Sequence, residues 1–276
     1  MLRSALIQQR SNSDATIHEL SQATNRARIA SHSVITWSLN ELVEVDSTQN
    51  VLRRLGFAGA DEGTLVVAKR QIAGRGRHGR TWASPEGGLY MSLLLRPPPS
   101  AMLQTLTLAS SLAVVRGMKK ATNVDALIRW PNDVMIKGRK VAGVVAESSY
   151  VGQRLSFVTV GIGVNCNSGV ALEDPSSPAT SLAEQVGDEV DLVRLRQAIL
   201  EAFAAIHEKW LGGEDMVSAA RGAIGTIGKR VVVEKKSGES FKGRVQDVER
   251  MGGLVLELSD RRLILQAEEV ERLREA

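Results

Sequence analysis

Residues 71–82 constrain the chain most, because they alternate flexible and cationic residues over a short distance. The stretch is Gln-Ile-Ala-Gly-Arg-Gly-Arg-His-Gly-Arg-Thr-Trp, and no acidic residue lies between Lys69 and Arg80. Glycine allows positive φ and close approach to a ligand, but makes a free loop costly to order. Arginine supplies permanent charge and a planar donor fork that fits phosphate. The pattern predicts a loop that settles around an anion, although a solvated surface loop or a nucleic-acid-contacting arm has the same composition.

The overall composition is that of a soluble globular protein with one large or two ordinary domains. The 276 residues are 43% hydrophobic, 24% charged and only 4% aromatic, so the core must consist mostly of Val, Leu, Ile and Ala. A net charge of +4 favours local positive patches over a DNA-coating surface. No apolar run approaches the roughly 18 residues of a membrane span, and the N-terminus lacks a signal-peptide core.

Cysteine and histidine usage argues against disulfides and against a metal held by protein side chains. Cys166 is the single cysteine, so a reducing cytoplasm is the natural location. The four histidines include no close pair, and the chain has no Cys-x-x-Cys motif. Cys166 ends a predicted strand without a nearby histidine, which favours a buried hydrophobic role over that of a nucleophile.

The order of predicted elements indicates an α+β fold with a mixed or antiparallel sheet, because strands outnumber the helices between them. A polar N-terminal extension, residues 1–38, contains a short predicted helix near 17–29. The expected strands are 42–45, 63–69, 88–96, 126–130, 134–136, 141–147 and 155–164. The expected helices start at Asp46-Ser47-Thr48 and cover 103–121 and 192–211, and Leu106, Ala109, Ala113, Val114 and Gly117 form a small-residue face suited to close packing.

The C-terminal part reads as a separate small β domain. Gly222, Gly225 and Gly228 mark a boundary, and all-β patterns follow at 230–235, 240–249, 253–258 and 262–266. Four or five short strands in about fifty residues fit an SH3-like barrel. Its charges nearly cancel, so it does not resemble an autonomous nucleic-acid binder.

Three further segments carry polar groups in suggestive places, and each has a plainer explanation. Residues 129–133 (Arg-Trp-Pro-Asn-Asp) follow a strand, where ligand groups gather, but Pro-Asn-Asp also favours turns. Lys140 begins a strand with Gly143 and apolar neighbours, yet a solvated turn lysine looks alike. The hydroxyls of Ser47 and Thr48 can bind a ligand at a helix N-terminus, or simply cap the helix.

Taken in order, these segments resemble the biotin–protein ligase (biotin–[acetyl-CoA-carboxylase] ligase) family over about residues 40–276. The long glycine/arginine motif is highly specific, unlike a lone G-x-G-x-x-G. The motifs are Asp46-Ser47-Thr48, Gln71-x-Ala-Gly-Arg-Gly-Arg-x-Gly-Arg-x-Trp82, Leu89-Tyr90-x-Ser92, Trp130-Pro131-Asn132-Asp133, Arg139-Lys140-x-Ala-Gly143 with Glu147, and Gly161-x-Gly163-x-Asn165.

The resemblance implies a biotin/lipoate ligase-like catalytic domain (residues 39–225), an SH3-like domain (residues 226–276) and two half-reactions. Biotin and ATP form biotinyl-5′-AMP and pyrophosphate, with Mg²⁺ accompanying ATP. A lysine of a biotin carboxyl carrier protein domain then takes the biotin and releases AMP. Fixed cations lower the barrier to bringing a carboxylate toward a polyanion, and an ordered loop shields the anhydride from water.

The resemblance also assigns residues to these roles. It gives catalytic roles to Arg75, Arg77 and Lys140. It gives biotin contacts to Ser47, Thr48, Gln49, Gln71, Gly74, Arg75, Gly76, Arg77, Tyr90, Lys140 and Gly143. It gives nucleotide contacts to Arg77, Arg80, Trp82, Arg129, Asn132, Asp133, Lys140 and Asn165. Whether Asp133 orients a cation or the incoming lysine stays open, as does the choice between adenine and the closed loop as the packing partner of Trp82.

Two departures and two rivals accompany this interpretation. Arg129 stands where the family often has lysine, and a fork differs from a point charge in geometry. The segment before residue 40 is shorter than the roughly 60 residues of a winged helix-turn-helix, which predicts a monofunctional ligase without DNA binding. Lipoate ligases share the fold but not the complete loop, and a nucleic-acid binder would need more flanking aromatics. The sequence leaves open whether two subunits pair through a sheet edge.

Overall fold

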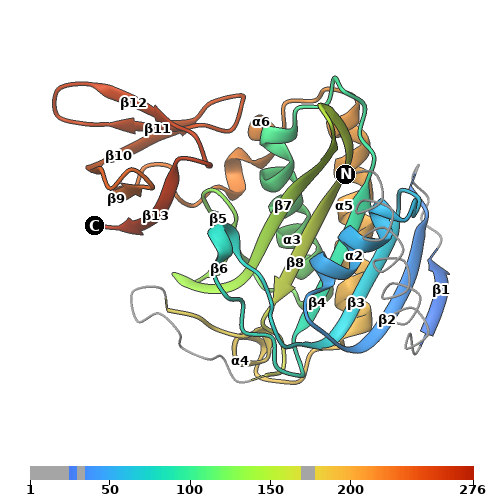
Figure 1. Cartoon of the computed structure of the whole chain (residues 1–276). Coiled ribbons are helices and arrows are strands. Elements are labelled where there is room, and N and C mark those ends of the chain that lie inside the picture. The colour runs from blue at the N-terminus through green and yellow to red at the C-terminus, as the bar shows by residue number, and fades with distance from the viewer. Residues whose placement is uncertain (1–24, 30–34, 169–177) are drawn as a thin grey trace. The chain divides into compact units, whose positions relative to one another are not determined.

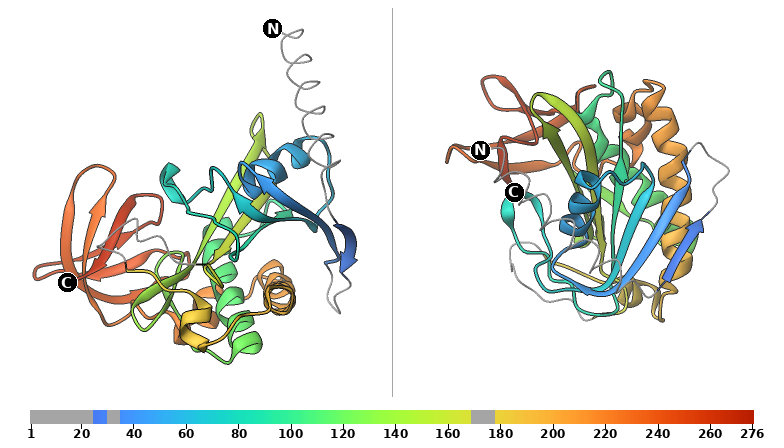
Figure 2. Two further views of the ribbon diagram at one scale, coloured as in Figure 1. Left: turned by 90° about the horizontal axis from the view of Figure 1, so that it is seen from below. Right: turned by 45° about the vertical axis from the view of Figure 1, so that its right-hand side comes forward.

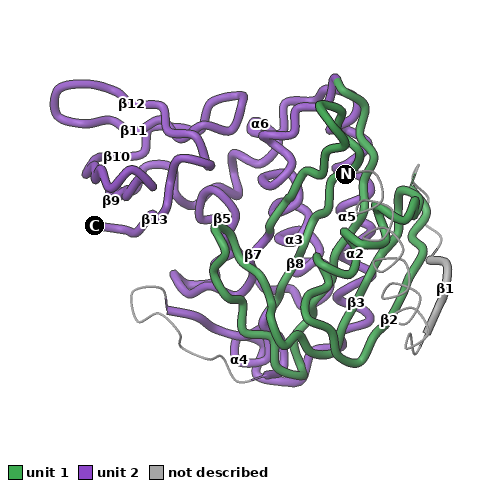
Figure 3. The backbone as a smooth tube through the Cα atoms, viewed as in Figure 1, with its two compact units in different colours: residues 1–99, 145–164 green, residues 100–144, 165–276 purple. Residues whose placement is uncertain are grey.

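The computed structural model describes residues 25–29, 35–168 and 178–276, which form two compact units interleaved along the chain (Figures 1 and 3). Unit 1 runs up to Pro99 and includes residues 145–164, and unit 2 holds residues 100–144 and 165–276. The helix predicted near 17–29 is wrong at its end, because Asn25–Ile29 form strand β1 against β2. The rest of that helix, and most of the predicted extension, lie outside the described residues.

Unit 1 is built on a mixed sheet, as predicted. Its strands neighbour one another in the order β1, β2 (Trp37–Val45), β3 (Thr64–Gln71), β4 (Leu89–Leu95) and β8 (Arg154–Val164). Strands β2 and β3 pair in parallel, while the other printed pairings in this unit are antiparallel. A parallel pair requires a crossover, and helix α2 (Thr48–Phe57) supplies it.

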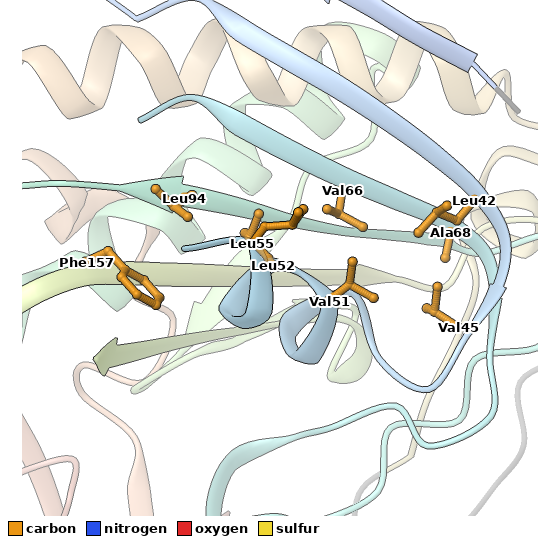
Figure 4. Close-up of a cluster of buried hydrophobic side chains, with 9 residues drawn as sticks. All are labelled: Leu42, Val45, Val51, Leu52, Leu55, Val66, Ala68, Leu94 and Phe157. Carbon is orange, nitrogen blue, oxygen red and sulfur yellow. The ribbon is translucent and has the colours of Figure 1, made fainter. Parts of the chain in front are cut away.

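Helix α2 is fixed in place by an apolar cluster beneath it. Val51 and Leu52 are fully buried and Leu55 nearly so, and the three share one face of the helix. They pack against residues of β2, β3, β4 and β8, with Phe157 at one end of the cluster and Val45 at the other (Figure 4). Burying such side chains contributes about 1.5–3 kcal/mol each, so the N-terminus of α2 is held at the ends of β2 and β3.

Unit 2 packs helices against a short antiparallel hairpin. Its strands are β5 (Leu127–Arg129), β6 (Asp133–Ile136) and the first part of β7 (Arg139–Val151), which continues into unit 1. Its helices are α3 (Leu106–Thr122), α4 (Leu182–Val186), α5 (Leu192–Leu211) and α6 (Met216–Ala220). Both α4 and α6 escape sequence detection because five residues carry too little periodicity. No helix in the described ranges is long and apolar enough to cross a membrane.

The C-terminal strands of unit 2 form a curled antiparallel sheet, drawn orange to red in Figure 2. The strands are β9 (Arg230–Lys235), β10 (Ser240–Val248), β11 (Leu254–Glu257), β12 (Arg262–Leu265) and β13 (Val270–Glu275). Their order is β12-β11-β10-β9-β13, and β10 and β13 contain irregularities that help a sheet bend. This agrees with the expected small barrel. The division at residues 225/226 falls within unit 2, and the domain limits stay predictions.

The predicted small-residue face of α3 lets α5 approach closely. A Cβ added at Gly117 would lie 2.5 Å from the Ile199 Cα. We therefore expect Gly117→Val to lower the free energy of unfolding by about 2–3 kcal/mol through overpacking, measured by urea denaturation. Gly222→Val is the matched control, because an added Cβ there meets no atom within 4 Å, and it should stay within about 0.5 kcal/mol. Equal midpoints for the two variants would contradict this packing.

Candidate active site

Residues 72–82 are named the Gly/Arg loop. A chain of side-chain hydrogen bonds joins the N-terminus of α2 to Ser84, which directly follows this loop. Gln71 Oε1 accepts from the Thr48 N–H at 2.8 Å and from its hydroxyl at 3.1 Å. Thr48 Oγ1 also lies 2.8 Å from Ser92 Oγ. On the other side, Gln71 Nε2 donates to Ser84 Oγ at 2.8 Å, and Ser84 donates to the Trp82 carbonyl at 2.9 Å. The Gln71 amide thus fixes the helix and the loop together.

Two buried polar atoms beside this chain are left without a partner. Ser47 occupies the N-cap position, but its side chain makes no capping bond, so the simple capping explanation is wrong. Instead, Gln71 takes over that task from 23 residues away. Ser47 Oγ and Gln49 Oε1 find no hydrogen-bond partner among the described residues, although these residues are only 1% and 5% exposed. Leaving such atoms unpaired costs about 1–3 kcal/mol each, and their predicted biotin contacts would satisfy them.

The Gly/Arg loop itself is a tight hairpin. Trp82 N–H donates to the Gly74 carbonyl at 2.9 Å, and Gly76 N–H donates to the Arg80 carbonyl at 2.7 Å. A Cβ at Gly74 would overlap the Trp82 carbonyl oxygen, whereas at Gly76 the nearest atom would be 3.4 Å away. Gly79 has φ of +75° at the tip, a conformation that suits glycine. Gly74 therefore allows a close backbone approach and Gly79 a positive φ, whereas Gly76 has room for a Cβ.

Two glycines of β8 make room for side chains that come from α2 and from the loop. A Cβ at Gly161 would lie 2.9 Å from Gln49 Cγ, and one at Gly163 would lie 2.6 Å from Trp82 Nε1. Gln49 Nε2 also donates to the Val145 carbonyl at 3.3 Å. The Gly-x-Gly spacing places both gaps on one face of the strand, so Trp82 packs on β8 in this structure.

The guanidinium of Arg75 is held by two residues outside the loop. Its NH1 donates to Asn50 Oδ1 at 2.9 Å, and its NH2 donates to Glu147 Oε1 at 3.0 Å. Asn50 Nδ2 in turn donates to Asp46 Oδ2 at 2.7 Å. Burial alone would raise the pKa of Asp46, but hydrogen bonds from Asn50 and the Ser47 N–H, with Arg54 nearby, bring it below its usual value. Asn50 thus links Arg75 to a carboxylate that stays ionised.

The remaining predicted residues of unit 1 lie around this centre. Arg77 NH2 lies 3.1 Å from His78 Nε2, and Arg80 is exposed near the tip. The Tyr90 side chain is buried, and its hydroxyl donates to the Pro85 carbonyl at 2.8 Å. Tyr90 therefore fixes the chain after the loop. Its direct contact with biotin stays a prediction, as do the binding roles of the other assigned residues.

In unit 2, Asp133 holds two cations. Its Oδ2 lies 2.7 Å from Arg129 NH2, and its Oδ1 lies 2.6 Å from Lys140 Nζ. Burial alone would raise the pKa of Asp133, but attraction to Lys140 and Arg129 outweighs it and lowers the pKa below its usual value. The carboxylate stays ionised and orients these two side chains, whereas the choice between a bound cation and the incoming lysine as its target stays open. The arginine fork reaches a single oxygen, as a lysine could.

The side-chain amides of Asn132 and Asn165 donate hydrogen bonds to backbone carbonyls. Asn132 Nδ2 donates to the Val144 carbonyl at 3.0 Å, and Asn165 Nδ2 donates to the Thr180 carbonyl at 3.1 Å. The Thr180 N–H also bonds the Lys140 carbonyl at 2.9 Å. These bonds fix the start of β7, which carries Lys140 and, three residues on, Gly143. Both asparagines therefore order the segment that holds the predicted nucleotide residues.

Trp130 ties this segment to the C-terminal sheet within unit 2. Its Nε1 donates to the Gly252 carbonyl at 2.9 Å, in the turn between β10 and β11. Its backbone N–H donates to Thr226 Oγ1 at 2.9 Å. Because Trp130 is only 2% exposed, these bonds are shielded from water, and they fix the chain three residues before Asp133.

Metal-binding potential is low in the part of the chain that the structure describes. No group of three or more His, Cys, Asp or Glu there could hold a metal ion. The buried Cys166 is fully enclosed, in agreement with the hydrophobic role expected for it.

Sequence reasoning missed the partners that organise the site. Ser92 and Glu147 stand in the motifs but received no role, and Asn50 was seen only as part of a helix start. Ser84 carried no signal, because its importance comes from the fold of the loop. These residues act through Gln71, Thr48 and Arg75, which patterns in one sequence do not reveal.

Comparison with known proteins places the chain among the biotin/lipoate protein ligases. The sequence model of the biotin/lipoate A/B protein ligase family matches residues 41–165. The biotin–[acetyl-CoA-carboxylase] ligase of Mycobacterium tuberculosis is 32% identical over 244 residues, which cover 86% of this chain and 89% of that relative. The chain belongs to the biotin–[acetyl-CoA-carboxylase] ligase family.

Other relatives differ in extent. The bifunctional ligase/repressor BirA of Bacillus spizizenii is 41% identical over 163 residues, 58% of this chain but only 50% of the relative, so the match spans about half its length. Among solved structures, the biotin protein ligase from Aquifex aeolicus in complex with biotin and ATP aligns with a TM-score of 0.75 and 31% identity. That alignment covers 86% of this chain and 99% of the other.

The base of the Gly/Arg loop should depend on Gly74. We expect Gly74→Ala to displace the Trp82 backbone and to speed trypsin cleavage within residues 75–80 severalfold, measured by limited proteolysis under native conditions. Gly76→Ala is the matched control in the same loop, because its Cβ would meet only ordinary contacts from 3.4 Å outward. Equal cleavage rates in both variants would show that the hairpin does not close at Gly74.

The charge of Asp133 should stabilise the fold in a pH-dependent way. Because its folded-state pKa lies below the usual 3.8, the contribution is present above pH 3.8 and is lost as the pH falls through the folded-state pKa. Asp133→Asn leaves two enclosed cations uncompensated, so we expect a loss of about 3 kcal/mol at pH 7.

Urea unfolding at pH 7 and pH 3 tests this expectation, and the difference from wild type should shrink at the lower pH. Asp125→Asn serves as control, because Asp125 also pairs with a lysine but its side chain is 87% exposed. It should change stability by less than about 1 kcal/mol. A pH-independent loss in Asp133→Asn would point to lost hydrogen bonds rather than lost charge.

Proposed function

We propose that the protein is an ATP-dependent biotin–protein ligase. In the first half-reaction, a biotin carboxylate oxygen attacks the α-phosphorus of ATP, the bond to the β-phosphate oxygen breaks, and pyrophosphate leaves. In the second, a lysine amine of an acceptor protein attacks the acyl carbon of biotinyl-5′-AMP, loses a proton and displaces AMP. Membership of the family supports this proposal, and so does the Aquifex aeolicus relative solved with biotin and ATP.

The observation that carries the proposal is a pair of enclosed, uncharged polar atoms next to a positioned cation. Biotin has a neutral cyclic urea at one end, with one acceptor and two donors, and a carboxylate at the other. Ser47 Oγ can donate or accept, and Gln49 Oε1 can accept. Arg75 brings the charge that suits the carboxylate. The dithiolane ring of lipoate would leave both oxygens unpaired, a cost that a hydrogen-bonding site uses to reject such analogues.

On the nucleotide side, we propose that Lys140 and Arg129 bind the triphosphate. Asp133 shares its charge between them, so the trio carries one net positive charge and holds its donors in place before ATP arrives. A preoriented cation stabilises charge that develops on the phosphoryl oxygens without reorganisation at the moment of reaction. In unit 1, we propose separately that Arg77, Arg80 and Trp82 of the loop contact the nucleotide and that the loop excludes water from the anhydride.

Magnesium enters as the counter-ion of ATP. The residues that the structure describes contain no cluster able to hold it, and Asp133 already serves two cations. The ion would accompany ATP and reduce the charge of its phosphates, while Lys140 and Arg129 would supply the protein's cations.

The acceptor we propose is the lysine of a biotin carboxyl carrier protein domain, and the location we propose is the cytoplasm, where the single cysteine stays reduced. Purified protein with ATP, Mg²⁺ and biotin should release pyrophosphate, and an added carrier domain should become labelled. Turnover with lipoate alone, or salt-sensitive DNA retention without turnover, would overturn the proposal.

Two cation deletions test the proposed chemistry. We expect Arg75→Ala and Lys140→Ala each to slow biotinyl-5′-AMP formation by about 10²–10³-fold, the usual cost of losing a positioned charge, measured by single-turnover pyrophosphate release. Arg274→Ala, which removes a surface ion pair with Glu234 in the C-terminal sheet, should keep the wild-type rate. Circular dichroism confirms folding. Near-normal rates in both deletions would remove these residues from the mechanism.

A further inference from the structure

We propose that Glu147 and Asn50 are positioning residues for the adenylation step, and that they act by holding the guanidinium of Arg75. This inference rests on the proposed function, and it deepens that function by naming residues that the reaction uses without touching the substrates. Neither residue is in the loop: Glu147 lies on β7 and Asn50 in the first turn of α2.

The two contacts fix the orientation of the fork. Glu147 accepts from NH2 at 3.0 Å and Asn50 accepts from NH1 at 2.9 Å, so both terminal nitrogens are anchored. A guanidinium has five N–H donors, and these two bonds leave the others for an anion. A planar group anchored at two points cannot turn about its own axis, so its remaining donors face a constant direction.

Energetics favour orientation over stability as the purpose of this pair. The side chains of Arg75 and Glu147 are 35% and 30% exposed, and ion pairs of that exposure contribute little to folding. Alignment of a cation with a reacting centre is worth more, because misplacement by about 1 Å can cost about 100-fold in rate. The pair therefore matters more to the reaction than to the fold.

Asn50 extends the anchor into α2. Its Nδ2 donates to Asp46 Oδ2, which prevents the amide from rotating its oxygen away from Arg75. Asp46 is itself fixed by the Ser47 N–H at 2.7 Å. Arg75 is thus anchored to the N-terminal end of α2, which also carries Ser47 and Gln49. One helix positions both the neutral and the charged groups proposed to bind biotin.

The test is a double-mutant cycle in single-turnover biotinyl-5′-AMP formation. We expect Glu147→Ala to lower the maximal rate by about 10- to 100-fold with the unfolding midpoint unchanged. Glu147→Gln keeps an acceptor oxygen and should lose only a few-fold. In an Arg75→Ala background, Glu147→Ala should change the rate less than twofold, because the group that it positions is gone.

The matched control is Glu201→Ala, which removes an ion pair with Lys120 at 2.6 Å between α3 and α5 and should leave the rate unchanged. Losses that multiply in the double variant, or a wild-type rate in Glu147→Ala, would overturn the positioning role while the ligase function stands. A wild-type protein that forms no biotinyl-5′-AMP would overturn the proposed function, and this inference with it.

Discussion

The carboxamide of Gln71 is the interaction on which the unit 1 site depends. Its oxygen caps α2 through Thr48, and its nitrogen holds Ser84 at the return of the Gly/Arg loop. An amide is suited to this place because it accepts on one side and donates on the other. A carboxylate could keep the first set of bonds but would have no hydrogen for the second. The Gln71 carboxamide therefore fixes the end of β3, the start of α2 and the loop relative to one another.

In each compact unit, a carboxylate pairs with cations that we propose to act on the substrates, and this gives those cations a defined orientation. Glu147 holds Arg75 in unit 1, and Asp133 holds Arg129 and Lys140 in unit 2. Unpaired cations close together would repel and sample many rotamers. A shared carboxylate removes part of the charge but fixes its direction. The carboxylate weakens the electric field of the cations, but it fixes their orientation before the substrate binds. Such preorganisation stabilises a transition state.

The sequence predicted most of the fold, because apolar periodicity and turn residues determine elements locally. The start of α2 and the packing of α3 through Gly117 followed from such patterns. The site was harder. Capping was one of two explanations for Ser47, and the structure shows that Gln71 caps the helix instead. That exchange joins residues far apart in the chain, and so does the pairing of Arg75 with Glu147. Propensity acts within a few residues, whereas these contacts arise only once the sheet has formed.

The C-terminal sheet reaches the segment that holds Asp133. Ile224 and Gly225 run beside β5, where Gly225 N–H bonds the Ile128 carbonyl at 2.9 Å. Trp130 then bonds Gly252 through its indole. Since Trp130 is almost fully buried, breaking that bond would leave an enclosed N–H unsatisfied, which costs about 1–3 kcal/mol. The turn between β10 and β11 is thereby coupled to the strand end that precedes Asp133. The C-terminal sheet can in this way set the geometry of the cations that we propose bind ATP.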